Sequence, residues 1–294
     1  MNSSSVSVGF IGVGVMGASM AERLHAAYPN VHVYSRRKES AASLLAEGAV
    51  WHDSPAELAA HCTVIFSMVG YPADVEQIYF GPNGILDHAA EGTLCIDMTT
   101  SSPQLARKIY DYAKARGIAA LDAPVSGGDI GAKNGSLSIM CGGDEAAFRQ
   151  AEPYFRHIGT AWTLQGGAGC GQHTKAANQI AVAANLIGTV EALRYAETMR
   201  LDPQQVLQAI GGGAAGSWQL TNNGAKMLAG DFRPGFFVKH FLKDLSIALE
   251  AAQEAQLNLP LLRLAQSFFD TMTKTGAADL GTQALYEYYR MGRL

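Results

Sequence analysis

Short apolar runs alternate with helical patterns over roughly the first 165 residues. The runs typical of buried strands are Val6–Ile11, Val31–Tyr34, Thr63–Phe66, Thr93–Asp97, Ile118–Leu121 and Leu137–Met140, and Met16–Ala27 has the pattern of a helix. Strands that are apolar almost throughout are typical of a parallel sheet covered on both faces. Because crossovers between parallel strands are right-handed, we expect an α/β, doubly wound Rossmann-type domain over residues 1–165.

Strand patterns stop beyond residue 165, and the rest of the chain is predicted to be helical. The first helical pattern, Gln172–Arg200, contains no proline and would be about 43 Å long at about 1.5 Å per residue. Further helical patterns lie at Pro203–Ala209, Ser217–Met227, Val238–Ala255 and Leu259–Lys274. We therefore expect an all-α domain over residues 166–294.

A glycine-rich turn is predicted between the first strand and the first helix. The segment 12–17 reads G-V-G-V-M-G, which matches the dinucleotide motif G-x-G-x-x-G in the strand-to-helix context that the motif requires. Such glycines allow a tight turn, a close approach of the backbone to a pyrophosphate and close packing of the helix on the strand. The residues expected at the cofactor are Gly12, Gly14, Val15, Met16 and Gly17. The alternative is a glycine-rich turn that binds nothing.

The residues after the second predicted strand indicate which dinucleotide is bound. NAD enzymes place an Asp or Glu there, about 20 residues beyond the glycine motif, to hold the ribose 2′-hydroxyl. This chain has Ser35-Arg36-Arg37-Lys38 instead. A hydroxyl and a guanidinium bind a 2′-phosphate, which a carboxylate would repel. We therefore expect NADP, held by Ser35 and Arg36, with NAD as the alternative cofactor and a solvated basic cluster as the alternative structural role.

Lys175 is the one fully charged residue between Gln172 and Val190. A helix that is apolar on nearly all faces is a buried one, and a lysine that loses its hydration there becomes a usable general acid or base. The first helical turn, where we place Lys175, adds to this effect because the positive end of the helix dipole disfavours an ammonium. Asn178 and Gln179 would share its face. The alternative is a lysine that extends from the helix end into water.

The composition excludes several classes of partner. The formal net charge is −4 without a basic block, which argues against nucleic acid. Four scattered cysteines without a C-x-x-C pair argue against a zinc site or a disulfide framework and favour a reducing compartment. No apolar stretch reaches the length of about 18 residues that a membrane span needs. We therefore expect a cytoplasmic protein with no metal, nucleic acid or membrane partner.

Four segments together resemble the β-hydroxyacid dehydrogenase family, which includes 3-hydroxyisobutyrate dehydrogenases and the tartronate, glyoxylate and succinic semialdehyde reductases. In the family's order along the chain they are Gly9–Gly17, Asp122–Gly128, Gly169–Gln179 and Lys243–Leu245. The second is similar to the family's D-A-P-V-S-G-G motif, and the third to its G-x-G-x-x-x-K-x-x-N signature. The resemblance thus covers most of the chain.

The resemblance implies a role for each matching residue on the substrate side. Lys175 would give and take the proton of the substrate hydroxyl, and Asn178 would hydrogen-bond that oxygen or the carboxylate. Ser126, Gly127 and Gly128 would hold the substrate carboxylate, consistent with the anion nest that consecutive backbone amides form.

On the cofactor side, the resemblance implies that Met68, Val69 and Thr100 lie along the nicotinamide ribose. Lys243 would approach the cofactor or the substrate carboxylate. NADP-using members of the family resemble this chain in carrying an arginine after the second strand, which supports the role of Arg36.

The reaction implied is hydride transfer between a nicotinamide and a small, carboxylate-bearing 3-hydroxy acid or its semialdehyde. Gln179 stands where some members have a second asparagine, which weakens any statement about the substrate. Val182 stands where 6-phosphogluconate dehydrogenases carry a glutamate, so decarboxylation of a sugar phosphate is not expected. The alternatives are an imine reductase-like activity and a non-catalytic dinucleotide-binding scaffold, and the intact Lys175 argues against both.

The apolar second half of the chain also predicts association between subunits. The long apolar helix and its helical neighbours would expose apolar surface on a single subunit. We therefore expect a homodimer or homotetramer formed through residues 166–294. Trp218, next to the Gly211–Gly216 turn, is expected either in a pocket wall or in the core.

Overall fold

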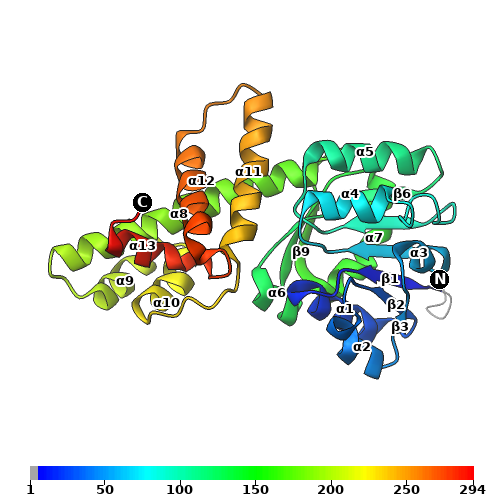
Figure 1. Cartoon of the computed structure of the whole chain (residues 1–294), viewed down its shortest axis with the longest axis horizontal. Coiled ribbons are helices and arrows are strands. Elements are labelled where there is room, and N and C mark those ends of the chain that lie inside the picture. Colours follow the sequence, from blue (N-terminus) through cyan, green and yellow to red (C-terminus); the bar gives the residue numbers. More distant parts are fainter. Residues whose placement is uncertain (1–5) are drawn as a thin grey trace. The chain divides into compact units, whose positions relative to one another are not determined.

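The computed structural model describes residues 6–294 (Figure 1), which form two compact units divided between Lys175 and Ala176. The division falls inside the long helix α8 (Cys170–Thr198), so this helix begins in the first unit and continues in the second. Within residues 6–294, no helix combines the length and the apolar character needed to cross a membrane.

A six-stranded parallel sheet forms the centre of the first unit, in the order β3-β2-β1-β4-β5-β6. The strands are β1 (Val8–Ile11), β2 (Val31–Tyr34), β3 (Val50–Trp51), β4 (Val64–Ser67), β5 (Leu94–Asp97) and β6 (Ala119–Asp122). Every residue of β1, β4 and β5 is buried, as expected for strands covered on both faces. The order of strands reverses between β1 and β4, and ligands of doubly wound folds bind at the carboxyl ends beside such a point. The doubly wound prediction is confirmed.

Helices cover both faces of this sheet. They are α1 (Val15–Ala27), η2 (Lys38–Ala41), α2 (Ala42–Ala46), α3 (Pro55–His61), α4 (Pro72–Phe80), α5 (Pro103–Lys114), α6 (Gly128–Asn134) and α7 (Glu145–Ile158). One core contains Phe10 and Phe66 together with side chains of α1 and α7, and the other contains Ile65 with side chains of α3, α4 and α5. In α5, a serine caps the helix just before a proline in its first turn: Ser102 Oγ accepts the amide of Leu105.

A second, three-stranded sheet contains β7 (Val125–Ser126), β8 (Leu137–Cys141) and β9 (Gly159–Leu164), in that order. The apolar run 137–140 is therefore a strand as predicted, but it does not continue the parallel sheet: β8 pairs antiparallel with β7 and parallel with β9. An apolar run identifies a strand without identifying its neighbour, and two-residue β7 is too short to be predicted from its pattern.

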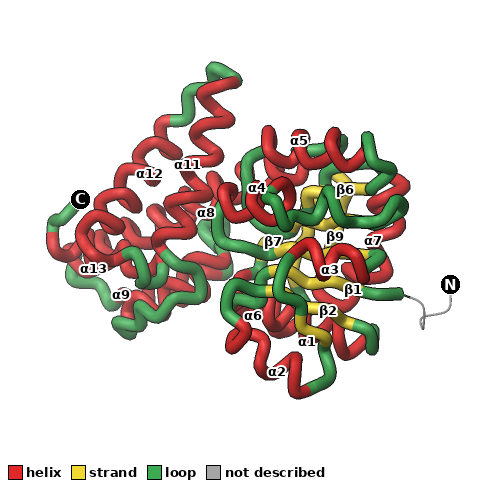
Figure 2. Tube along the Cα trace, turned by 45° about the vertical axis from the view of Figure 1, so that its right-hand side comes forward, coloured by secondary structure: helices red, strands yellow, loops and turns green. Residues whose placement is uncertain are grey.

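The second unit is helical, as predicted (Figure 2). After α8 it contains α9 (Pro203–Gly211), η3 (Gln219–Asn223), α10 (Gly224–Leu228), α11 (Val238–Glu254), α12 (Pro260–Met272), η4 (Thr273–Ala277), η5 (Thr282–Ala284) and α13 (Leu285–Met291). Its core includes Leu186, Phe241 and Phe269, with the last two rings 4.8 Å apart between α11 and α12. The helix predicted over 217–227 is instead a π-helical turn followed by a short α-helix.

Candidate active site

The glycine turn between β1 and α1 leaves no space for side chains at two of its three glycines. Gly12 has φ +99°, and a Cβ there would lie 2.2 Å from the carbonyl oxygen of Met68. At Gly17, a Cβ would lie 2.0 Å from the carbonyl oxygen of Gly12, so α1 packs directly on the turn. Around Gly14, by contrast, nothing lies within 4 Å of the same position. The turn is thus tight on its inner side and open at Gly14.

The first turn of α1 fits an anion. No side chain caps it at Gly14, and its first turn contains no acidic residue. Val15 is 66% exposed, and Met16 is half-buried. Uncapped amides at a helix N-terminus donate to phosphate oxygens, and the helix dipole favours their charge. Together with the open position at Gly14, this arrangement fits the pyrophosphate of a dinucleotide.

The end of β2 carries Ser35, which is half-buried, and Arg36, whose side chain is 81% exposed. The Arg36 guanidinium lies 3.3 Å from Asp74 Oδ1 of α4. The other oxygen of Asp74 accepts the amide of Tyr71 and so caps α4. A carboxylate therefore faces the predicted phosphate-binding arginine from another helix. No local pattern predicts this pair, because the two residues are 38 positions apart.

The loops after β4 and β5 are held together by buried hydrogen bonds. The amide of Val69 donates to Thr99 Oγ1 at 3.0 Å, which joins the predicted Met68–Val69 loop to the loop that carries Thr100. Asp97 Oδ1 accepts both the Ser67 hydroxyl at 2.8 Å and the Thr99 amide at 3.1 Å. Burial raises the pKa of Asp97 from 3.8 to about 6, against the opposing effect of these bonds.

Lys175 is buried, with 7% of its surface exposed, and its Nζ donates to the carbonyl oxygen of Val125 at 2.8 Å. The alternative of a lysine extending into water is therefore wrong. α8 begins at Cys170, so Lys175 is in its second turn and not, as predicted, in its first. The helix dipole therefore acts on Lys175 less strongly than expected, since its effect falls off beyond the first turn.

The predicted carboxylate-binding segment follows Val125 directly. Ser126 ends β7 and is half-buried. Gly127 and Gly128 have φ +130° and +64°, conformations that glycine adopts without strain. The bond from Lys175 to Val125 thus brings the lysine amine to the strand whose next residues are the predicted anion-binding ones.

Two residues that the sequence analysis did not assign hold the start of α8. Asp122, at the end of β6, accepts the amides of Gly169 and Gln172, each at 2.8 Å. The side chain of Gln172 donates to the Thr99 carbonyl and accepts the Ser101 amide. These partners lie at least 47 positions apart in sequence, so no local pattern could have indicated them.

The remaining predicted residues lie in the second unit, within one hydrogen-bonded chain. The Asn178 side chain donates to Gln179 at 2.8 Å, and Gln179 in turn donates to the buried carboxylate of Asp244 at 2.6 Å. Lys243 Nζ lies 3.0 Å from the other oxygen of Asp244. The structure thus connects Asn178 to Lys243 through Gln179 and Asp244. Trp218 is 58% exposed, so the expected alternative that it belongs to the core is wrong.

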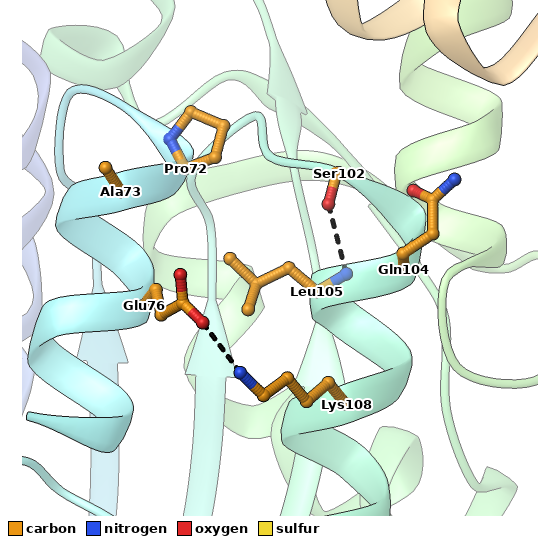
Figure 3. Close-up of a pocket in the computed structure, with 7 residues that line it drawn as sticks. All are labelled: Pro72, Ala73, Glu76, Ser102, Gln104, Leu105 and Lys108. Carbon is orange, nitrogen blue, oxygen red and sulfur yellow. Dashed lines mark hydrogen bonds and ion pairs between the residues drawn. The ribbon is translucent and has the colours of Figure 1, made fainter.

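A hollow of about 350 Å³ lies between α4 and α5. It is lined by Pro72, Ala73, Glu76, Ser102, Gln104, Leu105 and Lys108 (Figure 3). Lys108 and Glu76 point toward each other across it and form an ion pair at 2.6 Å. None of the predicted site residues lines this hollow.

Two family models match this chain along nearly its whole length. The model for the NAD binding domain of 6-phosphogluconate dehydrogenase matches residues 7–167. The model for the NAD-binding domain of NADP-dependent 3-hydroxyisobutyrate dehydrogenase matches residues 169–289.

Individual relatives are similar over almost their full length. An uncharacterized oxidoreductase of Bacillus subtilis (strain 168) is 52% identical over 96% of this chain and 98% of its own length. The 2-hydroxy-3-oxopropionate reductase of Escherichia coli (strain K12) is 40% identical over 95% of this chain and 96% of its own. The solved structure of Mycobacterium tuberculosis 3-hydroxyisobutyrate dehydrogenase with L-serine matches with a TM-score of 0.89 and 30% identity, over 97% of this chain and 99% of that one.

Motifs, fold and relatives agree over both units of the chain. The match is not confined to the dinucleotide-binding half, which many unrelated oxidoreductases share. The chain therefore belongs to the β-hydroxyacid dehydrogenase family, and it is an NAD(P)-dependent oxidoreductase that acts on CH–OH groups.

Proposed function

We propose that the protein interconverts a small 3-hydroxy acid and its semialdehyde with NADP, and that Lys175 is the general acid and base. The observation that carries this proposal is the buried Lys175 amine, held 2.8 Å from the Val125 carbonyl beside Ser126, Gly127 and Gly128. A cation beside an anion-binding turn suits a substrate with a carboxylate near its reacting oxygen. The family assignment favours this activity over the imine reductase and scaffold alternatives.

The class of substrate is supported by the names of two relatives. One is a 2-hydroxy-3-oxopropionate reductase, and the other is a 3-hydroxyisobutyrate dehydrogenase whose solved structure contains L-serine. In 2-hydroxy-3-oxopropionate, 3-hydroxyisobutyrate and L-serine, the carboxylate carbon lies two bonds from C3, and C3 bears an aldehyde or hydroxyl oxygen. In the proposed complex, Ser126 and the amides of Gly127 and Gly128 bind the carboxylate, and Asn178 binds the reacting oxygen or the carboxylate.

When bound, the nicotinamide supplies or accepts the hydride. Lys175 donates a proton to the substrate oxygen during reduction and accepts it during oxidation. An ammonium carries three N–H groups, and the one directed at Val125 orients the amine. The carboxylate contacts hold the substrate so that its oxygen meets this amine, and such positioning accounts for a large share of an enzyme's rate enhancement.

The preference for NADP is proposed from Ser35 and Arg36 at the end of β2. The exposed guanidinium of Arg36 has only a weak partner, a long ion pair to Asp74, and is free to form a bidentate pair with a 2′-phosphate. The second family model carries the words NADP-dependent in its description, which supports the same choice. Gly12, Gly14, Val15, Met16 and Gly17 would bind the pyrophosphate, Met68, Val69 and Thr100 the nicotinamide ribose, and Lys243 the cofactor or substrate carboxylate.

We also propose that residues 1–165 bind the dinucleotide and that residues 166–294 complete the substrate site and join subunits. Several large apolar side chains of the second unit are exposed, among them Tyr195 at 63% and Leu201 at 52%. Exposed apolar surface of this kind supports a homo-oligomer.

The test is the initial rate of NADPH and NADH oxidation with glyoxylate and with succinic, methylmalonic and tartronic semialdehydes. We expect turnover with NADPH, and in Lys175→Ala a kcat lower by about 10²- to 10⁴-fold, the usual contribution of general acid–base catalysis. Lys274→Ala, which removes an exposed lysine, is the matched control. A Lys175→Ala variant with the wild-type kcat would contradict the role of Lys175, and faster turnover with NADH would contradict the choice of NADP.

A further inference from the structure

The carboxylate of Asp122 is placed as a cap on a helix that is distant in sequence. Asp122 is the last residue of β6 and is 5% exposed. Its Oδ1 accepts the Gly169 amide and its Oδ2 accepts the Gln172 amide, each at 2.8 Å. Helix caps usually come from the residue just before the helix. Here the cap comes from the last strand of the six-stranded sheet, so the start of α8 is tied to that sheet.

The contact between β6 and α8 leaves no room for a Cβ at two glycines. A Cβ on Gly171 would lie 2.5 Å from the carbonyl oxygens of both Asp122 and Met140. A Cβ on Gly142 would lie 2.6 Å from Asp122 Oδ1 and 2.7 Å from the Gly171 amide nitrogen. Both positions therefore require glycine. At Gly171, the backbone of α8 therefore packs directly against the ends of β6 and β8.

Gln172, whose backbone amide donates to Asp122, also binds the loop after β5 through its side chain. Its Nε2 donates to the Thr99 carbonyl at 2.8 Å, and its Oε1 accepts the Ser101 amide at 2.9 Å. Both ends of the amide are thus used, and Gln172 is 1% exposed. The loop that carries Thr100 is held in this way against the first turn of α8.

Lys175 lies three residues beyond Gln172, on the same face of α8. Its amine donates a hydrogen bond to the carbonyl oxygen of Val125, which follows Asp122 by three residues. We propose that Asp122 is a positioning residue for the reaction: it fixes the first turn of α8, and thereby sets the place of the Lys175 amine relative to the anion-binding turn and the Thr100 loop. The inference rests on the proposed role of Lys175.

Asp122→Asn is the sharpest variant because it keeps the shape of the side chain. An asparagine accepts one of the two amides through its oxygen, but its NH₂ group faces the other amide, so one capping bond is lost. We expect kcat to fall about ten- to a hundredfold, the effect of a displacement of about 1 Å. The KM for NADPH should stay within about threefold, because binding contacts remain.

A solvent deuterium isotope effect separates positioning from simple loss of folded protein. If Lys175 is displaced, proton transfer becomes slower and the isotope effect on kcat increases. A smaller fraction of folded enzyme lowers kcat without changing that effect. Rates are therefore expressed per NADPH-binding site, titrated by fluorescence. Asp202→Asn is the matched control, because Asp202 also caps a helix, α9, through two amides. It should behave as the wild type.

Two outcomes overturn the inference: a kcat for Asp122→Asn within about threefold of the wild type per binding site, or a lower kcat with an unchanged isotope effect. If Asp122→Asn does not fold, Asp122→Glu decides, since it keeps the charge but moves the carboxylate oxygens away from the Gly169 and Gln172 amides; a wild-type kcat and isotope effect in that variant overturn the inference. Lys175→Ala distinguishes the two proposals. Wild-type activity in it removes the proposed function, whereas an inactive Lys175→Ala beside a normal Asp122→Asn removes the inference alone.

Discussion

At the scale of single residues, the site depends on charges whose partners are near. Arg36 faces Asp74, Lys243 faces Asp244, and Lys175 donates to the backbone carbonyl of Val125. In the proposed function, the strength of each of these interactions decides whether the cation can exchange its partner for a ligand. An arginine with an exposed, weak partner can exchange it for a phosphate, whereas a buried pair such as Lys243–Asp244 costs much more to separate.

Arg36→Leu should therefore change the cofactor preference. Loss of a charged hydrogen-bonding partner, about 1.5–3 kcal/mol, raises the KM for NADPH by about ten- to a hundredfold. The KM for NADH should stay nearly the same, because NADH has no 2′-phosphate. Steady-state kinetics with both cofactors measure the effect, with Arg149→Leu, on the exposed surface of α7, as control. An equal increase for both cofactors would mean that Arg36 does not bind the 2′-phosphate.

Asp97 predicts a pH dependence of stability. Burial raises its pKa from 3.8 to about 6, so the folded state binds the proton more tightly than the unfolded state does. Stability contributed by this proton is fully present below pH 3.8 and is lost as the pH rises through about 6. Asp97→Asn keeps an acceptor for Ser67 and Thr99 and removes this loss. Relative to the wild type, the variant should gain about 2 kcal/mol between about pH 4 and pH 7.

Urea unfolding at the two pH values measures this gain, with exposed Asp111→Asn as control. If the difference in unfolding free energy between Asp97→Asn and the wild type is the same at both pH values, the carboxyl of Asp97 does not titrate as its burial implies.

At the scale of elements, the sequence predicts what depends on local pattern. The run Val31–Tyr34 is observed as β2 with the same bounds, and the helix predicted from Gln172 starts two residues earlier, at Cys170. Lys175 could be singled out because no other residue between Gln172 and Val190 carries a full charge. Asp122 and Asp74 could not, because their roles depend on partners that only the folded chain brings near. The neighbour of the strand at 137–140 was missed for the same reason.

The packing of α1 on its turn gives a test at this scale. Gly17→Ala places a Cβ against the Gly12 carbonyl oxygen, a backbone atom that cannot move aside, so both stability and NADPH binding should decrease. The expected loss is about 1–3 kcal/mol, as for an overpacked core. Gly188→Ala is the matched control in α8, where nothing lies within 4 Å; an alanine there should stabilise the helix by up to about 1 kcal/mol.

Thermal and urea unfolding measure the stability of both variants, and NADPH titration measures their affinity for the cofactor. Equal stability of Gly17→Ala and Gly188→Ala would show that the turn adjusts, and that the third glycine of the motif is not required for packing.

At the scale of the whole molecule, exposed apolar side chains of the second unit predict self-association. Leu257, Leu261 and Leu264 lie at and after the connection between α11 and α12, and they are 53%, 41% and 46% exposed. We expect light scattering to give at least twice the 31.2 kDa of one chain. Leu264→Glu should shift the mass toward one chain if this region joins subunits. A mass of one chain for the wild type would contradict the proposed oligomer.

The position of α8 has a consequence for how this family can diversify. Asp122 accepts hydrogen bonds from amides at the start of this helix, whereas most of the helix belongs to the second unit. A chimera joined near residue 165 would pair the capping strand of one parent with the helix start of another, and would succeed only where Asp122, Gly142 and Gly171 have counterparts on both sides. The two halves therefore cannot be exchanged freely between relatives. Recombination that preserves activity should favour crossovers after residue 175, because Asp122, the start of α8 and Lys175 then come from the same parent.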